Sequence, residues 1–338
     1  MDNKIEKAIL FCIEAFNNRE RGSREVKVNS EFVLATLKEI MQLPYQGRNL
    51  GFGAFGYADY RSSFESMKLR FEKDSITHSL GWLDALLVLF DFANYDEETM
   101  LQFAEKIVND NIMYNHVLKH IITNCVVMND VEKALKFIPN FRTTKIFKEQ
   151  DNLDTGFLIV LKHHAMKGDD QNFFKYFKQS KPTVNKTEIN DAKGFLVKNY
   201  AQRNGIEQTI ALCNHKNLGP KFYFNALMAF AEQGKYQELK QVFQKYPEFS
   251  QPELETELNI LSTAFLNAKK INIITDDDFE QLFERALKVD RKLKWGDAKL
   301  QDSILFDLGL ASAGNKERIS RCKKAIKSNS LKRELASM

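Results

Sequence analysis

Apolar residues recur at helical spacing through most of the chain, in pairs of stretches separated by a turn residue. The clearest pair runs from Tyr223 to Phe243, with Gly234 between its two stretches. In each stretch the apolar positions lie three or four residues apart, which places them on one face of a helix. Pro247 follows the second stretch and cannot continue it. The pattern predicts a helical hairpin with a glycine at the turn.

The same pattern fits six further segments between residues 80 and 325. The predicted turn residues, most of them about 35 positions apart, are Asn94, Asn129, Gly168, Asn204, Gly234, Lys269 and Gly314. Such a period is typical of a tandem repeat. One hairpin cannot bury both of its faces, so neighbouring hairpins must stack on each other. We therefore expect an all-α fold, specifically a right-handed α-α superhelix (solenoid) of helix-turn-helix repeats.

This regularity divides the chain into three parts. Residues 1–80 are less regular, and we expect an N-terminal helical capping segment there, with a Gly-rich loop at 47–56. Residues 81–325 form the predicted array of about seven hairpins, and residues 326–338 are expected to be a basic C-terminal tail. The helices expected in the capping segment are Ile5–Phe16, Ser30–Leu43 and roughly Tyr60–Lys73.

Composition supports helices and narrows the class of protein. With 15 Gly and 6 Pro in 338 residues, the chain has too few turn residues for an all-β or α/β fold. Ten aromatic residues recur at helical spacing inside the hairpins, and we expect them to form the core rather than stacking platforms for bases. They are Phe90, Phe103, Phe157, Phe173, Phe177, Tyr200, Phe230, Phe243, Phe265 and Phe283.

Several classes of protein do not fit this sequence. No apolar run approaches the ~18–20 residues of a membrane span. Residues 1–21 mix acids and bases, unlike a signal or transit peptide. The four cysteines stand far apart without a CxxC pair, so they predict buried thiols rather than a zinc or redox motif. We expect an intracellular, cytoplasmic protein without membrane association, or a mitochondrial one if a transit peptide has been removed.

The net charge of +4 is unevenly distributed. From Arg285 to Met338 there are 14 Lys or Arg against 6 Asp or Glu, so this end carries the whole surplus. Its last part, from Arg318 onward, spreads its cations around a helix. Two interpretations stay open: a solvated, frayed C-terminal helix, or an electrostatic footprint for phosphates or an acidic partner.

Over about residues 80–325, the hairpins resemble the tetratricopeptide and pentatricopeptide classes of helical repeat. The two classes differ four residues after the opening aromatic of the first helix, where pentatricopeptide repeats tolerate a branched aliphatic residue. This chain has Leu87, Ile122, Leu161, Val197, Leu227 and Ser262 there. The segment Met113–Lys119 also looks like a pentatricopeptide opening. The resemblance therefore implies a non-enzymatic binding protein, with the pentatricopeptide class the better match.

The residues at the positions that would recognise RNA bases differ from the pentatricopeptide pattern. Modular pentatricopeptide proteins place a small polar residue one step after the opening aromatic. The residues here are Asp84, Lys119, Leu158, Gly194, Phe224 and Asn259. Only Asn259 fits well and Asp84 loosely, so no strict base code is expected. Polar residues on the first helices would instead contact a ligand on the concave face. The predicted contacts are Lys119, Lys162, Lys193, Lys198, Arg203, Lys221, Asn225 and Asn259, with Arg321 and Lys324 at the basic end.

Two functions follow from these observations. The first is binding of single-stranded RNA, or a role in a ribonucleoprotein, through a concave polar and basic face. The alternative is a tetratricopeptide-like scaffold that binds a peptide or partner protein. A continuous positive face would favour RNA, and a mixed or apolar face would favour protein. The sequence does not decide the oligomeric state.

The remaining motifs in the sequence are poor matches to known catalytic, cofactor-binding or metal-binding patterns. We therefore predict no catalytic, cofactor-binding or metal-binding residue. Gly51–Gly56 matches GxGxxG, but no strand precedes it, so we expect a loop rather than a dinucleotide site. An enzyme that uses this loop is the weakest hypothesis. His116 and His120 share a helix face without the glutamate of a zinc protease. His164 is expected in the core, and Asp276–Asp278 is expected as the acidic start of a helix.

Overall fold

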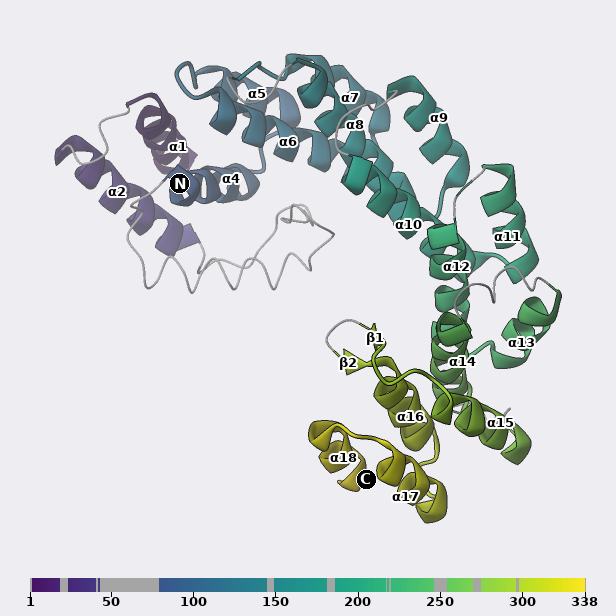
Figure 1. The fold of residues 1–338 in the computed structure, drawn as a ribbon. Helices are drawn as coiled ribbons and strands as arrows, with labels where there is room; N and C mark the ends of the chain where they lie inside the picture. Colours follow the sequence, from purple (N-terminus) through teal and green to yellow (C-terminus); the bar gives the residue numbers. More distant parts are fainter. Residues whose placement is uncertain are drawn as a thin grey trace. The chain divides into compact units, whose positions relative to one another are not determined.

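The computed structural model describes residues 2–18, 24–40, 42, 79–144, 149–180, 186–216, 218, 220–245, 254–269, 275–295 and 298–337. Over these residues the fold is all-α, with 17 α-helices, one short 3-10 helix and one hairpin of two-residue strands (Figure 1). Among the described residues, the helices that precede the hairpins are α1 (Asp2–Asn17) and α2 (Arg24–Ile40). The predicted helix at 60–73 and the Gly-rich loop at 47–56 lie outside the described residues.

Seven helical hairpins follow the predicted turns. They are α4 (Ser79–Ala93) with α5 (Glu97–Glu105), α6 (Asn111–Val127) with α7 (Val131–Phe137), α8 (Glu149–Met166) with α9 (Asp170–Ser180), α10 (Lys186–Arg203) with α11 (Ile206–His215), α12 (Pro220–Glu232) with α13 (Tyr236–Lys245), α14 (Leu254–Lys269) with α15 (Asp276–Leu287), and α16 (Leu300–Ala311) with α17 (Lys316–Ala325). The 3-10 turn Ile138–Asn140 follows α7, the strands β1 (Lys294–Trp295) and β2 (Ala298–Lys299) precede α16, and α18 (Asn329–Ala336) ends the described chain.

The turn residues explain where the hairpins bend. Five of the seven predicted positions have a left-handed backbone, with φ between 51° and 91°. They are Asn94, Asn129, Gly168, Gly234 and Gly314. Glycine has no Cβ to clash in this conformation, and asparagine tolerates it better than other side chains do. The predicted turns are therefore confirmed at these five positions.

A side-chain amide links successive hairpins in the same way three times. In each case it donates to a backbone carbonyl three residues before a turn position. The bonds are Asn199 Nδ2 to Ala165 O (3.3 Å), Gln233 Nε2 to Ala201 O (3.5 Å) and Asn267 Nδ2 to Ala231 O (3.3 Å). The last carbonyls of a helix have no partner within that helix, and the amides add a bond to them beside those that Gly168 N and Gly234 N donate to Ala165 O and Ala231 O. The sequence repeat is thus also a repeat of contacts.

The aromatic residues pack as expected. Seven of the ten predicted core aromatics are buried, and Phe157, Phe177 and Tyr200 are half-buried. His164 is also buried and stacks on Tyr176, with ring centroids 5.3 Å apart. All four cysteines are free and buried, and burial raises the pKa of each thiol.

The chain divides into two compact units: residues 1–164 with 171–189, and residues 165–170 with 190–338. In the first unit, α1 packs against α2 and α4, and α6 packs against α5 and α7. In the second, α14 packs between α12 and α16, and α16 packs against α17 and α18. No helix among the described residues has the length and apolarity to cross a bilayer.

The segment expected as a basic tail contains the folded helix α18. Its Leu335 is 1% exposed and packs so closely on Gly309 that a Cβ there would lie 2.9 Å from the leucine. The preceding turn is held by Asp302, whose carboxylate accepts hydrogen bonds from the backbone amides of Lys327 and Ser328, both at 2.9 Å. Specific packing and capping, rather than charge, organise this end of the chain.

Candidate ligand-contact surfaces

The predicted basic contacts of the first unit share one carboxylate. Lys162 on α8 lies 2.8 Å from Glu188 in the first turn of α10. Lys119 on α6 is half-buried, and burial lowers the pKa of its ammonium while the charge of Glu188 opposes that change. These lysines therefore belong to a mixed surface in which an acid lies among the cations.

The second unit brings other predicted contacts together between α10 and α12. Lys198 and Glu232 form an ion pair at 2.8 Å across the two helices. Asn225 lies directly over Gly194, where an added Cβ would come within 2.7 Å of its Nδ2 atom. Phe195, next to Gly194, has 45% of its surface exposed. Here an aromatic ring, an amide and an ion pair form one surface, which we call the α10–α12 face.

The other predicted contacts of the second unit lie in different surroundings. Burial lowers the pKa of Lys193, whereas Arg203 is exposed. Lys221 is the second residue of α12, but its side chain is outside the described residues. Asn259 is only 4% exposed, and its Nδ2 has no hydrogen-bond partner. It therefore lies within the helix packing and presents almost no surface to a ligand.

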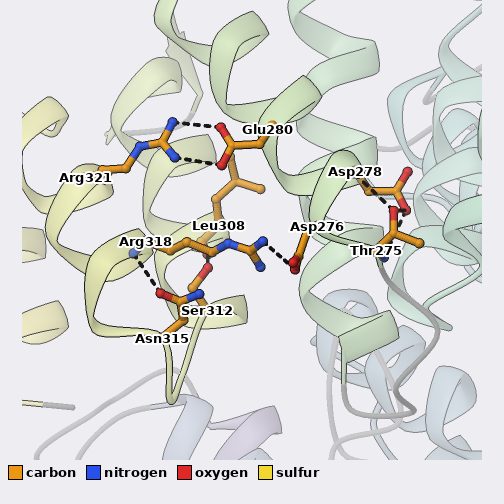
Figure 2. Close-up of polar contacts among 9 residues, drawn as sticks. All are labelled: Thr275, Asp276, Asp278, Glu280, Leu308, Ser312, Asn315, Arg318 and Arg321. Atoms are coloured by element: carbon orange, nitrogen blue, oxygen red, sulfur yellow. Dashed lines mark hydrogen bonds and ion pairs between the residues drawn. The ribbon is translucent and has the colours of Figure 1, made fainter.

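The two arginines of α17 are held by acids of α15 in the preceding hairpin (Figure 2). Arg321 donates to both carboxylate oxygens of Glu280, at 2.7 and 2.8 Å. Arg318 pairs with Asp276 at 2.5 Å. The hydrogen bond from Arg321 lowers the pKa of Glu280. Both guanidinium groups also lie over aromatic rings of α15, with Arg318 4.6 Å from the centre of Phe279. These arginines join α17 to α15, whereas Lys324 is exposed.

The acidic segment Asp276–Asp278 is the first turn of α15, as predicted for the acidic start of a helix. Thr275 is the N-cap residue and receives a hydrogen bond from the backbone N–H of Asp278 at 3.3 Å, while its own hydroxyl donates to the Asp278 carboxylate at 2.8 Å (Figure 2). Asp278 also accepts a bond from Lys240 of α13 at 2.8 Å. Burial would raise the pKa of Asp278, but the bonds from Lys240 and Thr275 hold it below its usual value.

A group of cations that the sequence analysis did not single out lies between α15 and α16. We call the described residues of the segment 288–299 the basic connection. Five of its side chains are exposed and form no ion pair with an acid among the described residues. They are Lys288, Arg291, Lys292, Lys294 and Lys299. The signal was present in the sequence, where five of the 14 cations of the basic end fall within these 12 positions. Helical periodicity gives no information about this segment, because it lies between two helices.

Buried histidines do not form a metal site in the described part of the chain. His120 lies 3.1 Å from Asp91 of α4, and both residues are buried. His116 is on the same helix, and burial lowers the pKa of its imidazole. No group of three or more potential ligands is found among the described residues.

Comparisons with known proteins returned nothing: no family model, no curated protein and no solved structure matches this chain.

Proposed function

We propose that this chain is a non-enzymatic helical-repeat protein whose hairpins stack as a right-handed superhelix and hold a protein or peptide partner along their first helices. The repeated turn conformation at Asn94, Asn129, Gly168, Gly234 and Gly314 supports a repeat architecture. So do the three amide links between successive hairpins. Extended arrays of this kind use their side chains along one face for binding.

This proposal depends mainly on one observation, which is that cations and acids are paired along the first helices of the hairpins. Lys162 is paired with Glu188 and Lys198 is paired with Glu232, each at 2.8 Å. A polyanion bound there would meet the carboxylates as well as the lysines. A peptide with both acidic and basic residues would find complementary groups, and charge complementarity of this kind favours specificity.

The α10–α12 face also offers an anchor for a partner. Phe195 is an aromatic residue with 45% exposure, and it lies one helical turn from Lys198. Aromatic residues are enriched at the centres of protein interfaces, where they supply a large share of the binding energy. An apolar side chain of the partner packed on Phe195, with its polar groups on Asn225 and the ion pair, is the arrangement that we propose.

The test is selection of peptides from a random library on the full-length protein, followed by calorimetry of the selected peptides. We expect Phe195→Ala to weaken binding by about tenfold or more, as loss of an interface anchor does. Val108→Ala is the matched control, because Val108 is apolar and 65% exposed but lies in the other unit. Equal effects of the two substitutions, or no selectable peptide, would count against the proposal.

RNA binding through the same helices, the first expectation from the sequence, has less support at this surface because Lys162 and Lys198 are paired with acids. Its natural test is the salt dependence of affinity, which should be steep for a ligand held by phosphates. One observation favours an anionic polymer at a different surface, and it concerns the basic connection.

A further inference from the structure

We propose that the basic connection is a second binding site, distinct from the α10–α12 face, which takes the phosphate backbone of a nucleic acid. It contains Lys288, Arg291, Lys292, Lys294 and Lys299, all exposed. Lysine and arginine contacts to phosphates supply most of the sequence-independent affinity of proteins for nucleic acids.

Among the residues that the structure describes, no acid forms an ion pair with the cations of the basic connection. Asp290 is the acid of this segment among the described residues, and its Oδ1 atom accepts a hydrogen bond from the backbone N–H of Lys292 at 2.9 Å. The arginines of α17 differ in this respect, because Glu280 and Asp276 pair with them. Charge that is paired holds helices together, and charge that is unpaired and exposed remains available to a ligand.

Two features of the backbone make the positive charge locally unfavourable. Lys294 and Lys299 are directly opposite each other in the antiparallel pair of β1 and β2, and like charges at such positions destabilise a strand pair. Lys299 is also the N-cap of α16, where the helix dipole is positive and disfavours a cation. The first-turn acid of that helix, Asp302, is turned to the amides of Lys327 and Ser328. An anion placed between the two lysines would relieve both repulsions.

The segment is held in a defined conformation. Gln301 is 2% exposed, and its Nε2 atom donates to the carbonyls of Ala286 and Leu287 at the end of α15, at 3.0 and 3.1 Å. The backbone N–H of Leu300 donates to Leu293 O at 3.0 Å and closes the connection. The cations are therefore presented on an anchored segment, which reduces the entropy lost when a ligand binds.

The composition of the site favours nucleic acid over protein. Lysine is depleted at protein interfaces, where aromatic residues, methionine and arginine are enriched. Four of the five cations here are lysines. A phosphate backbone is a repeating anion that several lysines can contact at once, without a specific arrangement of side chains.

The experiment measures fluorescence anisotropy of a labelled 20-nucleotide single-stranded RNA, and of a duplex DNA of equal length, with the full chain at 50 to 200 mM salt. If all five cations contact phosphates of a single strand, log Kd should change with log salt with a slope of about 3.5, so affinity should fall about 100-fold over this range. Lys294→Gln with Lys299→Gln should lower the slope by about 1.4 and weaken binding at 50 mM salt by at least tenfold. Lys294→Arg with Lys299→Arg should keep the binding.

The matched control is Lys136→Gln with Lys178→Gln, which removes the same charge from exposed lysines of the first unit. Equal losses in the control and the Lys294/Lys299 variant would overturn the proposal, because the effect would then reflect net charge alone. Binding to vesicles of anionic lipid without binding to either nucleic acid would also overturn it, as would binding that is insensitive to salt. Circular dichroism verifies that each variant is folded. Phe195→Ala should leave this binding unchanged, so failure here is distinguishable from failure of the proposed function.

Discussion

Gly234 should be one of the least replaceable residues of the second unit. Its φ of +71° lies in the left-handed region, which an alanine adopts only with strain. A Cβ at this position would also lie 2.8 Å from the backbone nitrogen of Ala268 on α14. The turn of one hairpin is thus in close contact with the first helix of the next. Gly234→Ala perturbs both the turn conformation and the contact between the hairpins.

The two costs can be separated because Gly314 has only one of them. Gly314 has φ +91°, and a Cβ there would meet nothing within 4 Å. Left-handed strain costs about 1–2 kcal/mol, and we expect that amount for Gly314→Ala. A clash with backbone atoms adds about 1–3 kcal/mol, because the neighbouring helix has to move. For Gly234→Ala we therefore expect about 2–5 kcal/mol.

The assay is urea unfolding followed by circular dichroism, which gives the free energy of unfolding of each variant. Gly168→Ala provides a second instance, since Gly168 has φ +60° and its Cβ would lie 2.8 Å from the backbone nitrogen of Tyr200. We expect Gly168→Ala and Gly234→Ala to destabilise the chain similarly, and both more than Gly314→Ala. If all three variants lose the same stability, the close approach of hairpins is not what requires glycine, and the reasoning fails.

Two further predictions concern buried polar groups. Burial raises the pKa of Asp307 to about 6, so ionising this carboxyl disfavours the folded state and stability should fall as pH rises from about 4 to 6. Asp307→Asn should remove about 3 kcal/mol of that fall, seen as urea midpoints that diverge above pH 6 and coincide near pH 4. Gln301→Ala should lower the free energy of unfolding by about 1–3 kcal/mol, because it leaves the carbonyls of Ala286 and Leu287 without their side-chain donor. Urea unfolding measures this change, and an unchanged midpoint would contradict the anchoring role of Gln301.

Local features of this fold could be predicted from the sequence. A positive φ restricts the choice of residue, so Gly and Asn at a regular period marked five turns correctly. The three acids at the start of α15 indicated the beginning of a helix, because negative charge is favourable in a first turn. The aromatic spacing likewise predicted seven buried rings of ten, since helical periodicity decides which face of a helix is apolar.

The candidate contacts were harder to predict because charge partners are distant in sequence. Arg321 was predicted to contact a ligand, but it pairs with Glu280, which is 41 residues away. Asn259 satisfied the sequence pattern of a base-reading position, yet helix packing leaves it 4% exposed. Neither the pairing nor the burial follows from local spacing, because each depends on how successive hairpins pack.

The sequence by itself determined an all-α chain of helical hairpins, since helix periodicity and turn residues act over a few positions. The tertiary structure alone decided which cations are available to a ligand. Packing of α17 on α15 neutralises Arg318 and Arg321, whereas the strand pair before α16 leaves Lys294 and Lys299 exposed and opposite each other. The physical reason is that an ion pair depends on distance in space, and only the folded chain sets that distance.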